Sequence, residues 1–213
     1  MVPNYTVQGT PNSPVLVFSN SLGSTFQMWE KVIPLLLPYF QVINYDTRGH
    51  RQNKHIGQQQ PNWSIADLGQ DVVSILDDLG VEKAHFCGLS MGGLIGQWLA
   101  IHHSSRINSL IISNSAAKIG DIERWNSRID TILSKGMESI VSDTMERWFT
   151  PAFIQHNPVW IERYSAMFSG SQREGYAKCC AAIRDADFRE AVHQITSKTL
   201  VITGEEDAVT TPE

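Results

Sequence analysis

Short apolar runs alternate with helix-like stretches along this chain, and this alternation limits its fold more than any other feature. Four runs stand in the first half, at residues 15–18, 42–45, 84–87 and 110–112. Between them apolar residues recur at helical spacing, most clearly after Ser64, where Ser64 is a candidate N-cap and Gly80 follows the last turn. Such alternation is typical of β-α-β units, so we expect an α/β fold with a mostly parallel sheet flanked by helices.

Residues 121–191 interrupt this pattern. Strand signals disappear there, and helical stretches are separated by Pro151, Pro158 and Gly170. An apolar run typical of a strand returns at 199–203. The chain has 213 residues, enough for one domain with an insertion. We therefore expect an α/β core made of 1–120 and 192–213, and an all-helical cap, 121–191, over the ends of the strands.

Composition and charge exclude several classes of protein. Hydrophobic residues make up 42% and charged residues 18%, as in ordinary globular proteins. The net charge is -5 and no basic run occurs, so we do not expect a nucleic-acid partner. We expect a small-molecule partner instead. No apolar stretch approaches the ~20 residues of a membrane span, and the first residues lack a signal-peptide pattern. We expect a cytoplasmic protein without a membrane partner, with Cys87, Cys179 and Cys180 as reduced, packed thiols.

A candidate nucleophile lies where the strand at 84–87 gives way to a helix. Residues 88–92 have the pattern G-x-S-x-G, with Ser90 at its centre, and an apolar helical pattern follows at 94–100. In this setting the chain turns so sharply at the serine that only glycine fits two positions before and after it, hence Gly88 and Gly92. The hydroxyl would be exposed above the sheet, beside a helix N-terminus that favours negative charge. The alternative is a glycine-rich turn with a solvent-facing serine.

A serine nucleophile needs fixed donors for the charge that develops on the substrate oxygen. A turn of small residues follows the first parallel strand, at 19–24. This loop supplies one amide of an oxyanion hole in such architectures, and the residue after the nucleophile supplies the other. We therefore assign the amides of Leu22 and Met91 to the oxyanion hole. An ordinary turn is the alternative interpretation of the loop.

The acid that orients the base should follow a later strand. The run at 199–203 is followed by Gly204 and then by Glu205, Glu206 and Asp207, of which we favour Asp207. A solvated acidic loop is the alternative. In this chain order the basic histidine comes after the acid, yet all seven histidines precede Asp207 and the general base stays unassigned. Each histidine is expected to be structural or at the surface, with His50 nearest to the strand ends.

Several stretches resemble the α/β-hydrolases, and within them the 3-oxoadipate enol-lactonases. The first two are shared by many α/β-hydrolases, and the others are specific to the lactonases: residues 19–23 (SNSLG), 45–50 (YDTRGH), 113–120 (SNSAAKIG), 147–151 (RWFTP) and 180–188 (CAAIRDADF). Relatives continue past the acid through a last strand, a histidine loop and a final helix. The resemblance therefore implies a chain truncated just after its acid, with the last strand and helix absent.

This resemblance implies a carboxylic ester hydrolase that opens 3-oxoadipate enol-lactone in aromatic-compound catabolism, the β-ketoadipate pathway. Ser90 would attack the carbonyl, and no cofactor or metal is required. The substrate is an anion, so a cation in the cap should hold its carboxylate. Trp125 and Arg128 lie three residues apart on one predicted helix face and could present an indole donor and a guanidinium together, and Arg184 is a second candidate. Surface arginines and a packed tryptophan are the alternatives.

Two other functions remain open at this point. Without a base, the chain could be a catalytically impaired binding scaffold, because triad members act as a unit and losing the histidine costs about 10⁶ in turnover in a known serine protease. It could also hydrolyse another ester or a carbon-carbon bond. An incomplete sheet would leave an unpaired edge, so self-association through that edge is a further expectation.

Overall fold

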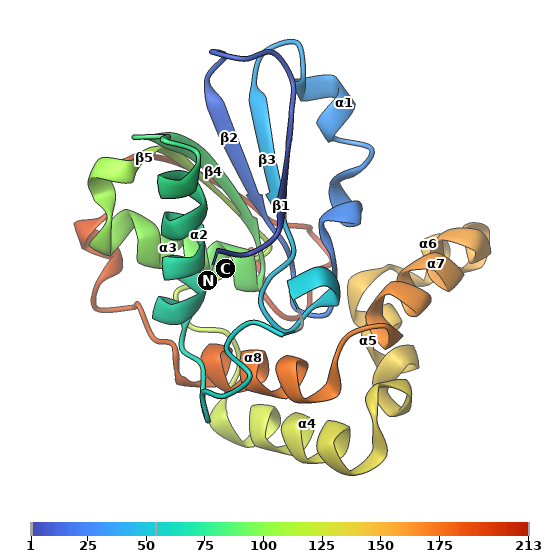
Figure 1. Ribbon diagram of the computed structural model, residues 1–213. Helices are drawn as coiled ribbons and strands as arrows, with labels where there is room; N and C mark the ends of the chain where they lie inside the picture. Colours follow the sequence, from blue (N-terminus) through green and yellow to red (C-terminus); the bar gives the residue numbers. More distant parts are fainter. Residues whose placement is uncertain (1, 54, 213) are drawn as a thin grey trace.

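The protein is built around one six-stranded sheet, seen in a computed structural model that describes residues 2–53 and 55–212 (Figure 1). The strand order is β1-β3-β2-β4-β5-β6. The strands are β1 Tyr5–Gln8, β2 Val15–Ser19, β3 Gln41–Tyr45, β4 Ala84–Leu89, β5 Ile107–Ser113 and β6 Lys198–Ile202. Every neighbouring pair is parallel except β1 with β3, which is antiparallel. The mostly parallel sheet is confirmed, and β1 is an additional edge strand that the apolar pattern did not predict.

Helices cover the two faces of the sheet unequally. The longest two in the core, α2 (Ile65–Asp78) and α3 (Met91–His102), pack against each other on one face. The other face carries a 3₁₀ turn, η1 (Phe26–Trp29), and the short helix α1 (Ile33–Leu36). Two further 3₁₀ turns lie in connections, η2 (Arg51–Asn53) and η3 (Ser104–Arg106). The core therefore has two layers of apolar side chains, one on each side of the sheet.

The alternation of side chains along a strand explains how one strand contributes to both apolar layers. Val17 of β2 belongs to the cluster with α2 and α3, whereas its neighbours Leu16 and Phe18 pack with Trp29 on the opposite face. Successive side chains of a strand point to opposite faces, and helices on both faces make each residue of such a strand buried. The N-terminus of α2 is also as predicted, since Ser64 and Asp67 form a reciprocal capping box.

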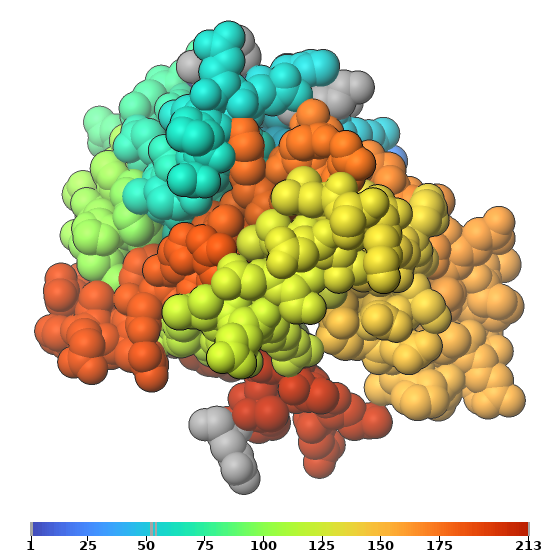
Figure 2. All heavy atoms as spheres, turned by 90° about the horizontal axis from the view of Figure 1, so that it is seen from below, coloured from blue at the N-terminus to red at the C-terminus, as the bar shows by residue number. Residues whose placement is uncertain are grey.

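The segment between β5 and β6 is helical and lies across one end of the core. Its helices are α4 Ile122–Lys135, α5 Val141–Trp148, α6 Pro151–His156, α7 Pro158–Ser169 and α8 Arg173–Asp185, with the 3₁₀ turns η4 Met137–Ile140 and η5 Val192–Gln194. Figure 2 shows the molecule from this side, with α4 and α8 packed side by side across the face. We refer to residues 121–191 as the cap.

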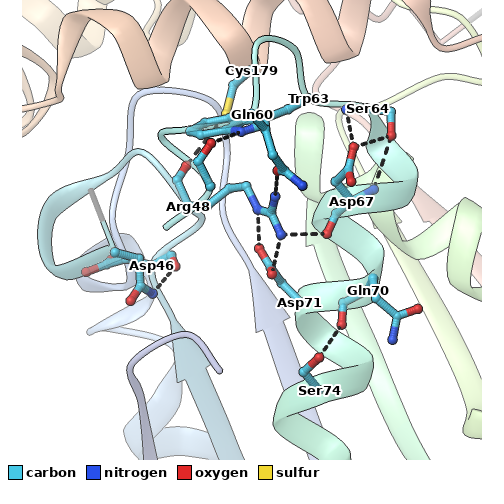
Figure 3. A network of polar contacts seen from close by, with 12 residues as sticks. Asp46, Arg48, Gln60, Trp63, Ser64, Asp67, Gln70, Asp71, Ser74 and Cys179 are labelled. Carbon is cyan, nitrogen blue, oxygen red and sulfur yellow. Dashed lines mark hydrogen bonds and ion pairs between the residues drawn. The ribbon is translucent and has the colours of Figure 1, made fainter. Parts of the chain in front are cut away.

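A buried ion pair joins the loop after β3 to a core helix. Arg48 donates to both carboxylate oxygens of Asp71 on α2, at 2.7 and 2.6 Å, and also to Gln60 (Figure 3). The thiol of Cys179 on α8 approaches the carbonyl oxygen of Arg48 at 3.7 Å. Removing one partner of such a buried pair typically costs about 3–5 kcal/mol. This network therefore holds the loop that carries His50 against both the core and the cap.

The outer strand β6 is the exposed element of the sheet. All five of its residues are exposed, and among the described residues it pairs only with β5. None of the helices in the described part of the chain has the length and apolar content that a membrane crossing needs.

Candidate active site

A cavity of about 320 Å³ lies between the ends of the core strands and the cap. Leu22, Ser90 and Asp207 line it from the core, and Trp125 and Arg128 line it from the cap. This volume is at the lower end of the range of small-molecule sites. Residues singled out along the whole chain therefore meet in one place.

Ser90 occupies the turn between β4 and α3 in a strained conformation. Its φ is 54° and its ψ is -112°, a combination that residues other than glycine rarely adopt. The bend leaves no space for side chains nearby: a Cβ on Gly88 would lie 2.0 Å from the oxygen of Gly92, and one on Gly92 would lie 2.3 Å from the oxygen of Ser19. Ser90 is half-buried and faces the cavity, as a nucleophile must.

Two backbone amides near Ser90 have no hydrogen-bond partner in the part of the protein that the structure describes. Among the described residues, neither the amide of Leu22 nor that of Met91 donates a hydrogen bond to a protein group. Met91 is the first residue of α3, so its amide also lies at the positive end of the helix dipole. Leu22 lines the same cavity. Both amides are available to an oxygen atom that acquires negative charge there.

His50 fixes the loop that carries the Leu22 amide. Its Nε2 accepts the amide of Gly23 at 3.0 Å, and its Nδ1 lies 3.2 Å from the carbonyl oxygen of Arg48, to which it donates. The ring is fully buried, and this burial lowers the pKa of His50 to about 4. His50 is therefore a neutral positioning residue, a role that its place in the sequence did not reveal.

Asp207 is the acidic residue that reaches the cavity, whereas the neighbouring Glu205 and Glu206 are exposed and do not line it. One carboxylate oxygen accepts from Asn114 Nδ2 and from the Thr210 hydroxyl, both at 2.7 Å. The other accepts two backbone amides, from Val209 and Thr210. Burial raises the pKa of Asp207, but the hydrogen bonds from Asn114 and Thr210 outweigh burial and lower it. Asp207 is thus a fixed carboxylate.

No histidine lines this cavity within the described residues 2–53 and 55–212. His50 faces the Gly23 amide, His85 contacts the Ser109 hydroxyl, and His156 contacts a carbonyl oxygen of its own helix. His102 and His103 pack against Trp98. Among the described residues, no histidine is therefore in a position to act as the general base for Ser90.

The cap contributes a cationic wall to the cavity. Trp125 and Arg128, which lie three residues apart on α4, both line it. However, the indole N–H of Trp125 donates to the carbonyl oxygen of Ile119 at 2.7 Å, so the indole offers a ring face and no donor. Arg184 does not line the cavity; its guanidinium binds Asp185 and Asn126 at the surface.

Two other arginines, Arg124 and Arg147, line the cavity instead. Arg124 lies on α4, one turn before Arg128, and the helical spacing of the pair is visible in the sequence. Arg147 lies on α5, in the RWFTP stretch, and no spacing rule connects it to α4. Arginines from two helices therefore form one wall that a single sequence window could not reveal.

Comparisons with known proteins agree with this geometry. A family model described as alpha/beta hydrolase fold matches residues 14–213. The chain is 43% identical to 3-oxoadipate enol-lactonase 2 of Acinetobacter baylyi, a match that covers 98% of this chain and 77% of the relative. It is 40% identical to 3-oxoadipate enol-lactonase 1 of the same organism, over 96% of this chain and 76% of the relative.

The crystal structure of the enol-lactonase from Burkholderia xenovorans LB400 is also similar. Its TM-score is 0.92 at 37% identity, and the match covers 98% of this chain and 80% of that chain. The likeness thus extends through core and cap alike.

Proposed function

Because this chain belongs to the α/β hydrolase fold family, we propose that it is a serine hydrolase that opens 3-oxoadipate enol-lactone to 3-oxoadipate. One observation carries the proposal: the strained Ser90 and Leu22, whose amide has no partner among the described residues, face a wall of arginines across one small cavity. Hydrolysis of an uncharged ester would need the serine and the amide donors but not the arginines. The 43% identity to a 3-oxoadipate enol-lactonase supports the same substrate and a place in aromatic-compound catabolism.

The first half of the reaction forms an acyl-enzyme. The Ser90 hydroxyl attacks the lactone carbonyl as its proton passes to a general base, and the carbonyl oxygen becomes an oxyanion that accepts the Leu22 and Met91 amides. The oxyanion then re-forms the carbonyl double bond as the ring carbon-oxygen bond breaks, and the electron pair of the broken bond leaves with the ring oxygen. The leaving oxygen takes up a proton and departs as an enol, which tautomerises to the ketone of the product.

The second half restores the serine. Water attacks the Ser90 ester, the same amides receive the second oxyanion, and collapse of that intermediate releases a carboxylic acid. Asp207 would orient the general base and stabilise its charged form, a role that its fixed, ionised carboxylate suits. This chemistry uses protein groups and water.

The arginine wall suits the anionic arm of the lactone. Arg128 is half-buried and lines the cavity opposite the core residues. A guanidinium binds a carboxylate through two parallel hydrogen bonds, which fixes orientation as well as charge. We assign the carboxymethyl arm to this wall and the ester carbonyl to Ser90. We further propose that the protein acts in the cytoplasm, since Cys87, Cys179 and Cys180 are free, buried thiols, as is usual in reducing compartments.

The proposal is tested with the enol-lactone itself. Purified protein is incubated with the lactone, and the loss of its absorbance is followed beside Ser90→Ala and beside Ser74→Ala, an exposed serine on α2. We expect Ser90→Ala to reduce the rate to the uncatalysed background and Ser74→Ala to retain the rate of the parent chain. Equal rates for the parent and Ser90→Ala would remove Ser90 from the mechanism.

A binding scaffold is the second candidate, and the lack of a histidine in the described cavity wall favours it. Calorimetry with a dicarboxylate, run beside the turnover assay, separates the two functions. A panel of simple esters addresses hydrolysis of another substrate.

A further inference from the structure

The hydroxyl of Thr144 joins two arginines of the cavity wall. Thr144 lies on α5 with 1% of its surface exposed. Its Oγ1 accepts a hydrogen bond from Nη2 of Arg128 and one from Nη2 of Arg147, each at 3.0 Å. The hydroxyl donates its own proton to the carbonyl oxygen of Ile140 at 2.7 Å. This donation orients both lone pairs of the oxygen toward the two guanidinium groups.

Neither cation has a carboxylate in direct contact. Within residues 2–53 and 55–212, neither Arg128 nor Arg147 forms an ion pair, and the charge of Asp143 on α5 acts on Arg147 only from a distance. Burial lowers the pKa of Arg147, and the charge of Arg128 lowers it further. Two like charges in a partly desolvated wall repel each other, and an anion bound between them would offset this repulsion by its attraction to both.

Donors of the arginine pair remain available to a ligand. Nε and Nη2 of Arg128 donate to the Tyr176 hydroxyl at 2.9 and 2.7 Å, which fixes the plane of that group, and the Cys180 thiol is a further partner of Arg128. Among the described residues, Nε and Nη1 of Arg147 donate to no protein group. Since both side chains line the cavity, a carboxylate there could accept from the two arginines at once.

We propose that Thr144 is a positioning residue that holds Arg128 and Arg147 together as a clamp for the second carboxylate of a dicarboxylate ligand. The clamp joins α4, which carries Arg128, to α5, which carries Arg147 and Thr144. This inference rests on the proposed function, because the lactone and its product carry the carboxylate that the clamp would bind. It assigns specificity to a pair of residues, Thr144 and Arg147, that do not touch the reacting ester.

The test compares a diacid with its uncharged diester. Adipate and dimethyl adipate have the same carbon chain, but only adipate carries a carboxylate that the clamp can bind, and isothermal calorimetry measures both without any need for turnover. The parent chain should bind adipate more tightly than the dimethyl ester. In Thr144→Val, which keeps the shape and removes the acceptor, we expect adipate affinity to fall by about tenfold, with the affinity for the dimethyl ester changed far less.

Two variants and one control complete the design. Arg147→Gln should reproduce the loss, and Thr144→Ser, which restores the hydroxyl, should retain the parent affinity. Arg173→Gln is the control, because Arg173 is a cap arginine that pairs with Glu174 and does not line the cavity. Circular dichroism confirms that each variant is folded. If Thr144→Val does not fold, Thr144→Ser and Arg147→Gln carry the comparison.

Two results would overturn the clamp. One is a parent chain that binds adipate and the dimethyl ester equally. The other is a ratio of the two affinities that stays unchanged in both Thr144→Val and Arg147→Gln. Neither result bears on Ser90, whose role is decided by the lactone assay, so failure of the clamp and failure of the proposed hydrolase are separate outcomes.

Discussion

His50 shows how one buried side chain can govern a backbone amide that it does not itself supply. Its ring lies between the carbonyl oxygen of Arg48 and the amide of Gly23, the residue after Leu22. Only the neutral ring can accept the Gly23 amide at Nε2, because both ring nitrogens of a charged histidine are donors. The loop that carries the proposed oxyanion donor Leu22 is therefore held by a residue whose protonation state depends on pH.

This arrangement predicts a specific dependence of stability on pH. The unfolded chain binds a proton at His50 near pH 6.5, whereas the folded chain does so only near pH 4. The stabilisation from the neutral ring is complete above pH 6.5 and is lost as the pH falls toward 4. The difference corresponds to roughly 3 kcal/mol.

Urea unfolding of the parent and of His50→Gln at several pH values between 7 and 4 provides the measurement. The free energy of unfolding of the parent should fall more steeply with decreasing pH than that of the variant. Few carboxyl groups titrate between pH 6.5 and pH 5. If the free energies of unfolding of the parent and the variant change in parallel over this range, the buried neutral ring is contradicted.

The turn between β4 and α3 is the element on which the proposed chemistry depends. Its backbone passes so close to itself and to the end of β2 that glycine is required at two positions. The same turn places Ser90 in the wall of the cavity and the Met91 amide at the start of α3. A change of shape here would thus move the proposed nucleophile and one proposed oxyanion donor together.

Gly92→Ala tests this packing. The added methyl group would lie 2.3 Å from the backbone oxygen of Ser19, so β2 and α3 must separate. We expect a loss of about 1–3 kcal/mol in the free energy of unfolding, measured by urea titration.

Gly204→Ala is the matched control, since its Cβ would meet its nearest atom, Asn114 Nδ2, at 3.6 Å. This variant should differ from the parent by less than about 1 kcal/mol. A Gly92→Ala variant as stable as Gly204→Ala would show that the turn has room for a side chain.

At the scale of the whole molecule, the cap and the core are interdependent. The cavity has walls from both, the Cys179 thiol meets the Arg48 carbonyl oxygen, and a Cβ on Gly175 would lie 2.5 Å from the Cα of Gly49. Strand β6, in contrast, is exposed to solvent. Leu200, Val201 and Ile202 are 55%, 62% and 48% exposed, which is unusual for apolar residues of a sheet.

Self-association through the β6 edge stays a prediction, and sedimentation velocity over a range of concentrations is its test. Unpaired strand edges with exposed apolar side chains pair readily with other chains, and charged residues prevent this pairing. Val201→Lys should therefore reduce association.

Val7→Lys, on the edge strand β1 at the other side of the sheet, should leave the association unchanged. Contrary evidence would be a parent chain that remains monomeric at every concentration, or an equal effect of both substitutions.

Local chemistry in the sequence determined the elements and the reactive turn. Ser64 predicted the start of α2 because a cap acts within one turn, and Gly88 and Gly92 identified the bend at Ser90 because its steric limits concern adjacent residues. The buried strands were likewise predicted from short apolar runs of consecutive residues. The sequence missed β1, whose residues are mostly exposed and carry no apolar run.

Only the tertiary structure decided which charged groups share the cavity. Arg128 was the first candidate in the sequence and Arg184 the second, but in the structure Arg184 pairs with Asp185 at the surface, while α5 brings Arg147 to the same hydroxyl as Arg128. Tertiary packing also pairs the Trp125 indole with the Ile119 carbonyl oxygen and places His50 against the loop of the proposed oxyanion donor Leu22. Side chains distant in sequence meet only once helices and sheet have packed, so no spacing along the chain encodes their contacts.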